Sequence, residues 1–145
     1  MLKLYLAAAW ENREAIIGYK KQLEDAGYIV TSTWMLQEST DDPVLLREHA
    51  LRDLEQLLAA NILVLINSQK RGQETSGKAV ETGVAIATLK GIILVGERSN
   101  IFHYLKIPVV ASLEEAIEEL KNWEAVTYSH PAWGEMESAA LKVRA

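Results

Sequence analysis

Three short apolar segments constrain the fold of this 145-residue chain more than any other feature. Residues 2–9, 62–66 and 92–95 are almost purely hydrophobic, and segments with the spacing of helices separate them. Strands without polar positions fit a parallel sheet whose two faces are both covered. The alternation of strands and helices therefore predicts a three-layer α/β fold.

Turn and cap signals complete the expected order of elements. Gly27 ends a first helix, Asp42 and Pro43 begin a second, and Ser112 with Glu115 forms a capping box that opens the last. Right-handed crossovers between five strands favour the order 2-1-3-4-5 of a flavodoxin-like or Rossmann-like sheet. The expected strands are 2–9, 28–33, 62–66, 92–95 and 108–110, and the main expected helices are 11–26, 43–60, 77–89 and 112–122. In the second helix we expect five apolar side chains to face inward: Leu46, Ala50, Leu54, Leu57 and Leu58.

Composition excludes several classes of function. The chain has no Cys, and no second His lies at metal-ligand spacing from His103, so we expect neither a metal site nor a cofactor. A net charge of −5 without long basic runs argues against a nucleic acid polymer as partner. The longest apolar runs are far shorter than a membrane span, and no leader pattern opens the chain, so we expect a cytoplasmic protein without membrane contact.

One carboxylate lies at the start of an otherwise apolar helix. Glu81 follows Gly77, precedes Gly83, and is placed by the pattern in the first turn of a mostly buried helix. An acid in the first turn stabilises a helix by roughly 0.3–1 kcal/mol through the helix dipole. This stabilisation could explain Glu81 without any catalytic role. Gly83 costs about 1 kcal/mol inside a helix and indicates close packing or space for a ligand. Pairing, capping and catalysis all remain open at this point.

The topology places this carboxylate near a site. In such sheets, ligands bind beyond the carboxyl ends of the strands. The first strand ends near Ala7 and runs into Trp10, so both are candidate substrate contacts. The loop that leaves the third strand leads to Glu81.

Four segments in this order resemble the nucleoside 2-deoxyribosyltransferase family, which includes deoxynucleoside 5′-monophosphate N-glycosidases. Together they span most of residues 2–120. They are the sequences LYLA at 4–7, RDLE at 52–55, ANILVL at 60–65 and GKAVETG at 77–83.

The resemblance implies roles for individual residues. Glu81 matches the nucleophile that attacks the anomeric carbon, and Tyr5 matches a tyrosine that orients and tunes it. Asp53 matches an acid that binds the sugar or helps to protonate the leaving base. Thr75 matches a loop residue that contacts the 5′ end of the substrate. His103 is a candidate contact to substrate across a subunit interface, because family members complete their sites in this way.

The chemistry requires these residue types. Cleavage of an N-glycosidic bond passes through an oxocarbenium-like state that a nearby carboxylate stabilises or captures. The base leaves poorly as an anion, so it needs a proton donor. Water in the second step makes a hydrolase, and a second base makes a transferase.

The 5′ end of the substrate depends on the loop before Glu81. Thr75, Ser76 and Gly77 offer hydroxyl and backbone N–H groups at a helix N-terminus, which suit a phosphate. Family members that use free nucleosides tend to have Asp at the position of Thr75. Residues 8–10 lack the polar and basic side chains of the monophosphate-specific branch, and Glu74 also opposes a phosphate. We expect a deoxynucleoside 5′-monophosphate, or else the free deoxynucleoside.

Two alternatives stay open: a deoxyribosyltransferase acting on free nucleosides, and a non-catalytic nucleotide-binding module of the same fold. A phospho-acceptor receiver is excluded, because Asn67 stands where its Asp would be. We expect one domain over residues 1–122 and an aromatic-containing extension over 123–145. We expect the protein to form a homodimer or a larger assembly. Its expected ligand is a small nucleoside or nucleotide. Apolar surface in the second and third helices and the aromatic tail support the assembly.

Overall fold

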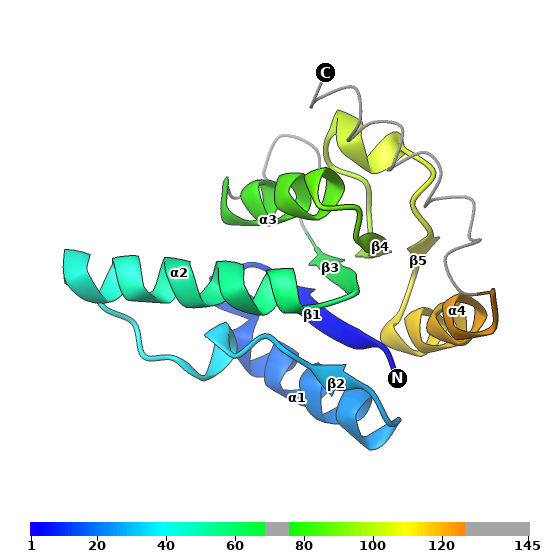
Figure 1. The fold of residues 1–145 in the computed structure, drawn as a ribbon, viewed down its shortest axis with the longest axis horizontal. Coiled ribbons are helices and arrows are strands. Elements are labelled where there is room, and N and C mark those ends of the chain that lie inside the picture. Colours follow the sequence, from blue (N-terminus) through cyan, green and yellow to red (C-terminus); the bar gives the residue numbers. More distant parts are fainter. Residues whose placement is uncertain (69–75, 127–145) are drawn as a thin grey trace.

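The computed structural model describes residues 1–68 and 76–126 and has a five-stranded parallel sheet (Figure 1). The strand order β2-β1-β3-β4-β5 confirms the predicted topology. The strands are β1 (Lys3–Ala7), β2 (Ile29–Val30), β3 (Ile62–Asn67), β4 (Gly91–Gly96) and β5 (Val109–Val110). The α-helices are α1 (Arg13–Asp25), α2 (Pro43–Ala59), α3 (Ser76–Ala87) and α4 (Leu113–Val126). Three short 3₁₀ helices are η1 (Trp10–Asn12), η2 (Trp34–Leu36) and η3 (Ile101–Tyr104).

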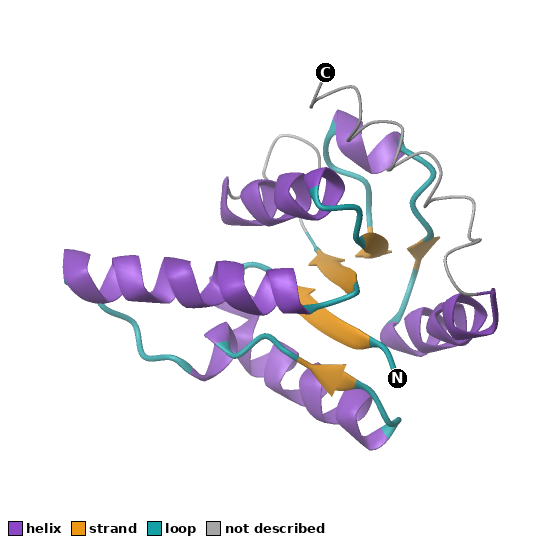
Figure 2. Cartoon of the chain, in the orientation of Figure 1, coloured by secondary structure: helices purple, strands orange, loops and turns teal. Residues whose placement is uncertain are grey.

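Helices cover both faces of the sheet. In Figure 2, α2 and α3 lie on one side of the strands, and α1 and α4 lie on the other. Gln22 Nε2 of α1 donates to Glu114 Oε1 of α4 at 3.3 Å, which joins the two helices of the second side. This double cover explains why the central strands contain no polar alternation.

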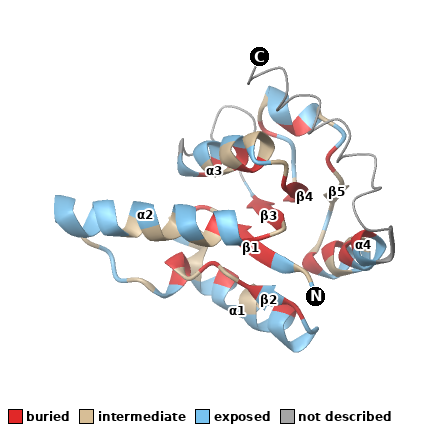
Figure 3. Ribbon diagram, viewed as in Figure 1, coloured by how far each residue is buried: buried red, intermediate tan, exposed pale blue. Residues whose placement is uncertain are grey.

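The core runs along β1, β3 and β4, the buried strands at the centre of Figure 3. All six residues of β3 are buried, and β1 is buried from Leu4 to Ala7. Tyr5 pairs in register with Leu63, so its side chain is fixed in the middle of the sheet. The fold thus holds a polar phenol inside its core.

Helix caps form where the sequence predicts them. Asp42 Oδ1 accepts from Val44 N at 2.9 Å, with Pro43 as the first residue of α2. Ser112 Oγ accepts from Glu115 N at 3.2 Å. At its other end, α2 is closed by a buried cation, because Lys90 Nζ donates to Leu58 O at 2.8 Å and to Ala60 O at 2.7 Å. Desolvation lowers the pKa of Lys90.

The prediction for the inward face of α2 was mostly wrong. Of the five apolar residues expected to face inward, only Leu57 is buried, and Leu46, Leu54 and Leu58 are exposed by 47%, 37% and 53%. The reason is that α2 touches the body along one side and leaves the rest of its surface open, as the pale blue ribbon in Figure 3 shows. Leucine content alone therefore overstated its burial.

The start and burial of α3 also differ from expectation. The helix begins at Ser76, so Glu81 lies in its second turn, and no acid occupies the first. Val80 is 59% exposed, and nothing lies within 4 Å of a Cβ built at Gly83. Gly83 therefore does not mark close packing within the described chain.

Two close approaches fix glycines in β4. A Cβ at Gly91 would overlap the ring of Trp123, and one at Gly96, whose φ is +114°, would overlap the backbone oxygen of Asn67. Trp123 is buried in α4, which continues to Val126 beyond the expected end at residue 122. The rest of the predicted extension, 127–145, lies outside the described residues. Within the described chain, no helix is long and apolar enough to cross a membrane.

Candidate active site

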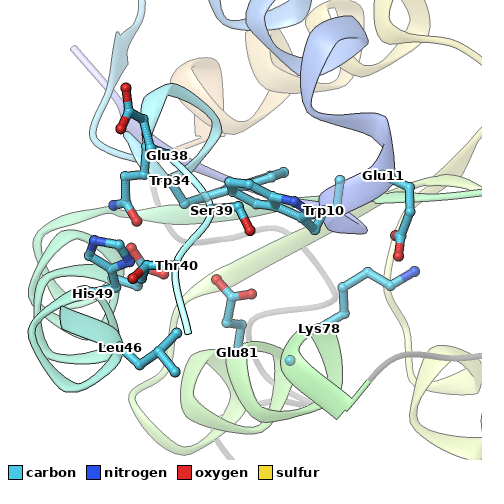
Figure 4. Close-up of a pocket in the computed structure, with 14 residues that line it drawn as sticks. Trp10, Glu11, Trp34, Glu38, Ser39, Thr40, Leu46, His49, Lys78 and Glu81 are labelled. Carbon is cyan, nitrogen blue, oxygen red and sulfur yellow. The ribbon is translucent and has the colours of Figure 1, made fainter. Parts of the chain in front are cut away.

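A pocket of about 420 Å³ opens at the carboxyl end of β1, between η1, the segment after η2, α2 and the start of α3 (Figure 4). This is the place that the topology predicts for a ligand. Its lining residues are Ala8, Trp10, Glu11, Trp34, Gln37, Glu38, Ser39, Thr40, Leu46, His49, Asp53, Gly77, Lys78 and Glu81.

Glu81 points from α3 into the middle of this pocket (Figure 4). Burial raises the pKa of its carboxyl to about 7, the Tyr5 hydroxyl lowers it, and the charge of Asp53 raises it again. Oε2 is buried and has no hydrogen-bond partner of good geometry among the described residues. A carboxyl group with a raised pKa, whose buried oxygen faces a cavity, is a candidate catalytic group.

Tyr5 lies within interaction distance of the same carboxyl. It is completely buried in β1, and burial, followed by the charge of Glu81 and a hydrogen bond to it, raises the pKa of Tyr5. Tyr5 Oη completes no hydrogen bond of strict geometry within the described chain. The mutual effects on pKa nevertheless show that hydroxyl and carboxyl lie within interaction distance, so we regard the contact as a loose hydrogen bond.

Asp53 is another carboxyl of the pocket, which Glu11 and Glu38 also line. It is half-buried on α2, and desolvation raises its pKa, while Arg52, a hydrogen bond from Gln37 and the charge of His49 lower it. Asp53 Oδ1 and Gln37 Nε2 are both buried without a partner of full geometry, so the bond between the two side chains is also loose. Asp53 and Glu81 are close enough for the charge of Asp53 to raise the pKa of Glu81.

Two tryptophans form an aromatic wall. The ring centroids of Trp10 and Trp34 are 6.3 Å apart, with planes tilted by 44°. Trp34 Nε1 donates to Leu6 O at 2.7 Å, which fixes that ring, and the Arg13 guanidinium lies 4.8 Å from the Trp10 centroid. Flat apolar surface beside two carboxyls suits a molecule with a planar base and a polar sugar.

Lys78 anchors the start of α3 to the end of β3. It is only 5% exposed, and its Nζ donates to Asn67 Oδ1 at 2.8 Å. Asn67 Nδ2 in turn donates to Glu97 O at 2.7 Å and to Ser99 Oγ at 2.9 Å. This buried polar chain holds the helix that carries Glu81 in a fixed position relative to the sheet.

The structure brings together the three predicted catalytic residues: Asp53 and Glu81 line one pocket, and the buried Tyr5 lies within interaction distance of both although it is not a lining residue. Of the predicted substrate contacts, Trp10 and Gly77 line the pocket. Ala7 is buried in β1 and is not among the lining residues. Ser76 is the first residue of α3, and Thr75 lies outside the described residues.

His103 lies elsewhere. It is 4% exposed in η3, where its Nδ1 accepts from Ser99 N at 2.9 Å, and it borders a small separate cavity together with Asn67 and Lys78. It does not line the main pocket of this single chain.

Sequence reasoning missed one whole wall of the pocket. Gln37, Glu38, Ser39 and Thr40 follow η2 in a segment without a recognisable motif. His49 had a usable signal, since it lies four residues before Asp53 on the same helix and must share its face. Among residues 1–68 and 76–126, no group of three or more His, Cys, Asp or Glu side chains is arranged to hold a metal ion.

Comparisons with known proteins connect this geometry to a fold. No protein-family model matches the chain, and no curated protein does. A 2-deoxyribosyltransferase from Bacillus psychrosaccharolyticus superposes with a TM-score of 0.62 at 21% identity, over 79% of this chain and 90% of that one. The CMP N-glycosidase BcmB of Clostridium botulinum gives 0.53 at 18% identity, over 83% and 98%.

A conserved protein from Enterococcus faecalis V583 gives a TM-score of 0.58 at 19% identity, over 84% of this chain and 98% of that one. The chain shares the fold of these proteins. At such identities the likeness establishes the fold alone, and the function must be argued from the pocket.

Proposed function

We propose that this chain is an enzyme that cleaves the N-glycosidic bond of 2′-deoxynucleosides or their 5′-monophosphates, with Glu81 as nucleophile. The observation that carries the proposal is that Asp53 and Glu81 line one pocket, and that Tyr5 and Asp53 both act on the pKa of Glu81. The shared fold with a 2-deoxyribosyltransferase and a CMP N-glycosidase supports it.

The two carboxyls take different roles in the proposed mechanism. Glu81 in its ionised form attacks the anomeric carbon, and the electron pair of the glycosidic bond moves to the base nitrogen. Asp53 in its protonated form supplies the proton that the base needs to leave. Both carboxyls are desolvated, and the charge of Asp53 further raises the pKa of Glu81, so a proton on Asp53 favours the ionised form of Glu81.

Tyr5 keeps the nucleophile ionised and in place. A hydroxyl that donates to the carboxylate favours the charged form, which opposes the effect of burial. Trp10 and Trp34 provide the surface against which the base would lie. In this arrangement the base end of the substrate would face α2, and the 5′ end would face Gly77 and Lys78, which line the pocket at the start of α3.

The test is base release from a panel of deoxynucleosides and their 5′-monophosphates, followed by chromatography of the free base. We expect release from at least one compound, with faster turnover of a monophosphate than of its nucleoside. A second base added to the same mixture distinguishes transfer from hydrolysis. If the protein binds the panel but releases no base, the chain is a non-catalytic nucleotide-binding module and the proposal is wrong.

We also propose that the protein is a homo-oligomer. Val44, Leu51 and Leu58 repeat every seven residues along α2 and are exposed by 65%, 46% and 53%. Leu54, exposed by 37%, adjoins this row. An apolar stripe of this kind on a long helix fits the facing helix of a second subunit.

A further inference from the structure

His49 has no role so far, although it belongs to the pocket. It lies one helical turn before Asp53 on α2, and both line the same cavity as Glu81. Residues four apart on a helix share a face, with Cβ atoms about 6 Å apart. Figure 4 shows the imidazole at the end of the pocket occupied by Thr40 and Leu46, across from Glu81.

Asp53 needs a source of protons. In the proposed reaction it gives its proton to the leaving base and becomes a half-buried carboxylate, which the desolvation at this position disfavours. Its Oδ1 is buried and has no partner of full geometry within the described part of the chain. The imidazole of His49 lies on the adjacent turn, lines the same cavity, and is near enough for its charge to act on the Asp53 carboxyl.

We propose that His49 is a positioning residue that returns a proton to Asp53, so that the two side chains form a proton relay to the leaving base. This inference rests on the proposed function. Histidine suits the role, because it is the side chain that ordinarily exchanges protons between pH 5 and 8.

The protons and charges balance. Glu81 forms a bond to the anomeric carbon, the bond to the base breaks, and the proton of the Asp53 carboxyl passes to the base nitrogen. The imidazolium N–H of His49 then breaks and reprotonates Asp53, which leaves the base, Asp53, His49 and the Glu81 ester all neutral. In the second step water attacks the anomeric carbon, one proton of that water passes to His49, and the electron pair of the ester bond returns to Glu81, which is again a carboxylate.

The charged groups around His49 act on the same relay. Arg52 and Asp53 belong to its own helix, Glu38 belongs to the segment after η2, and Glu81 faces it from α3. The charge of His49 lowers the pKa of Asp53, so the two side chains interact electrostatically.

The experiment separates proton supply from structure by changing the leaving group. His49→Gln keeps a polar side chain of similar length, but glutamine cannot take up and release a proton. We expect it to slow the release of adenine or cytosine by about 10-fold or more, below the 10²–10⁴-fold typical of direct proton transfer. Nitrophenyl 2-deoxyriboside, whose phenolate leaves without a proton, should be cleaved at the wild-type rate.

Chemical rescue provides a second readout. In His49→Ala, added imidazole should restore base release in proportion to its concentration, which a merely structural defect would not allow. Glu48→Gln is the matched control, because this exposed neighbour on α2 does not line the pocket and its exchange should leave both substrates unaffected.

The outcomes are distinct. Equal slowing of both substrates in His49→Gln, or no slowing of base release, overturns the relay while the proposed function stands. Failure of imidazole to rescue His49→Ala also overturns it. If the wild-type protein releases no base from any compound, the proposed function fails and this inference fails with it.

Discussion

Tyr5 and Glu81 form a buried pair in which the tyrosine hydroxyl lowers the pKa of the carboxyl and the carboxylate raises that of the phenol. The two residues come from β1 and α3, which are far apart in sequence, and Glu81 lines the pocket while Tyr5 is completely buried. Since burial and the charge of Asp53 both raise the pKa of Glu81, Tyr5 is the group that retains part of its negative charge near neutral pH. The pH dependence of the proposed enzyme should therefore be set by this contact.

Base release should require ionised Glu81. We expect kcat/KM to rise as the pH passes through about 7, the pKa to which burial raises this carboxyl. Tyr5→Phe removes the group that lowers this pKa, so the rise should move to higher pH and turnover at pH 7 should fall. A pH profile of base release for both proteins checks this, and identical acid limbs would contradict the role of Tyr5.

The same carboxyl should destabilise the fold at high pH. Its folded pKa of about 7 lies above the ordinary value of 4.5, so the stability that it contributes is complete below pH 4.5 and is lost as the pH rises through 7. The loss is on the order of 3 kcal/mol at most. Glu81→Gln should therefore raise the free energy of unfolding relative to wild type at pH 8, and the difference should shrink towards pH 5.

Urea denaturation at the two pH values measures this difference. Asp53→Asn provides a comparison, because desolvation also raises the pKa of Asp53 and the sign should be the same. A Glu81→Gln protein that is less stable than wild type at pH 8 would contradict the burial of an ionised carboxylate at this position.

The exposed stripe on α2 should hold subunits together. Leu51→Glu places a charge in the middle of the row formed by Val44, Leu51 and Leu58 and should convert the assembly to monomers. Light scattering at micromolar concentration measures this. Leu36→Glu is the matched control, since Leu36 is 59% exposed but lies in η2, outside the stripe. A wild-type protein that is already monomeric would exclude the proposed assembly.

The sequence was sufficient to predict the fold, because the apolar runs and helix caps are local features that support one another. Apolar runs located β1, β3 and β4, and Asp42 with Pro43 and Ser112 with Glu115 located two helix starts. Right-handed crossovers then left one strand order, which the structure confirms.

Burial on α2 was not predictable in the same way. Leu46 and Leu57 are equally hydrophobic, yet only Leu57 reaches the sheet, because the helix extends past the body of the domain. Which leucines are covered depends on where the other elements end, and this is a tertiary property.

The candidate site was predictable in part. Tyr5, Asp53 and Glu81 were identified through the resemblance of their segments to a known family, and spacing alone would not have connected them. Gln37 and His49 carry no such motif and enter the pocket only because η2 and α2 fold over β1.

Base release by Glu81→Gln tests the central claim most directly. With the compound that the wild-type protein cleaves fastest, we expect the variant to lose activity by two orders of magnitude or more, as expected when the nucleophile is removed. Circular dichroism and unchanged substrate binding would show that the fold and the pocket persist. A folded variant that retains more than a few per cent of the wild-type rate would show that Glu81 is not the nucleophile.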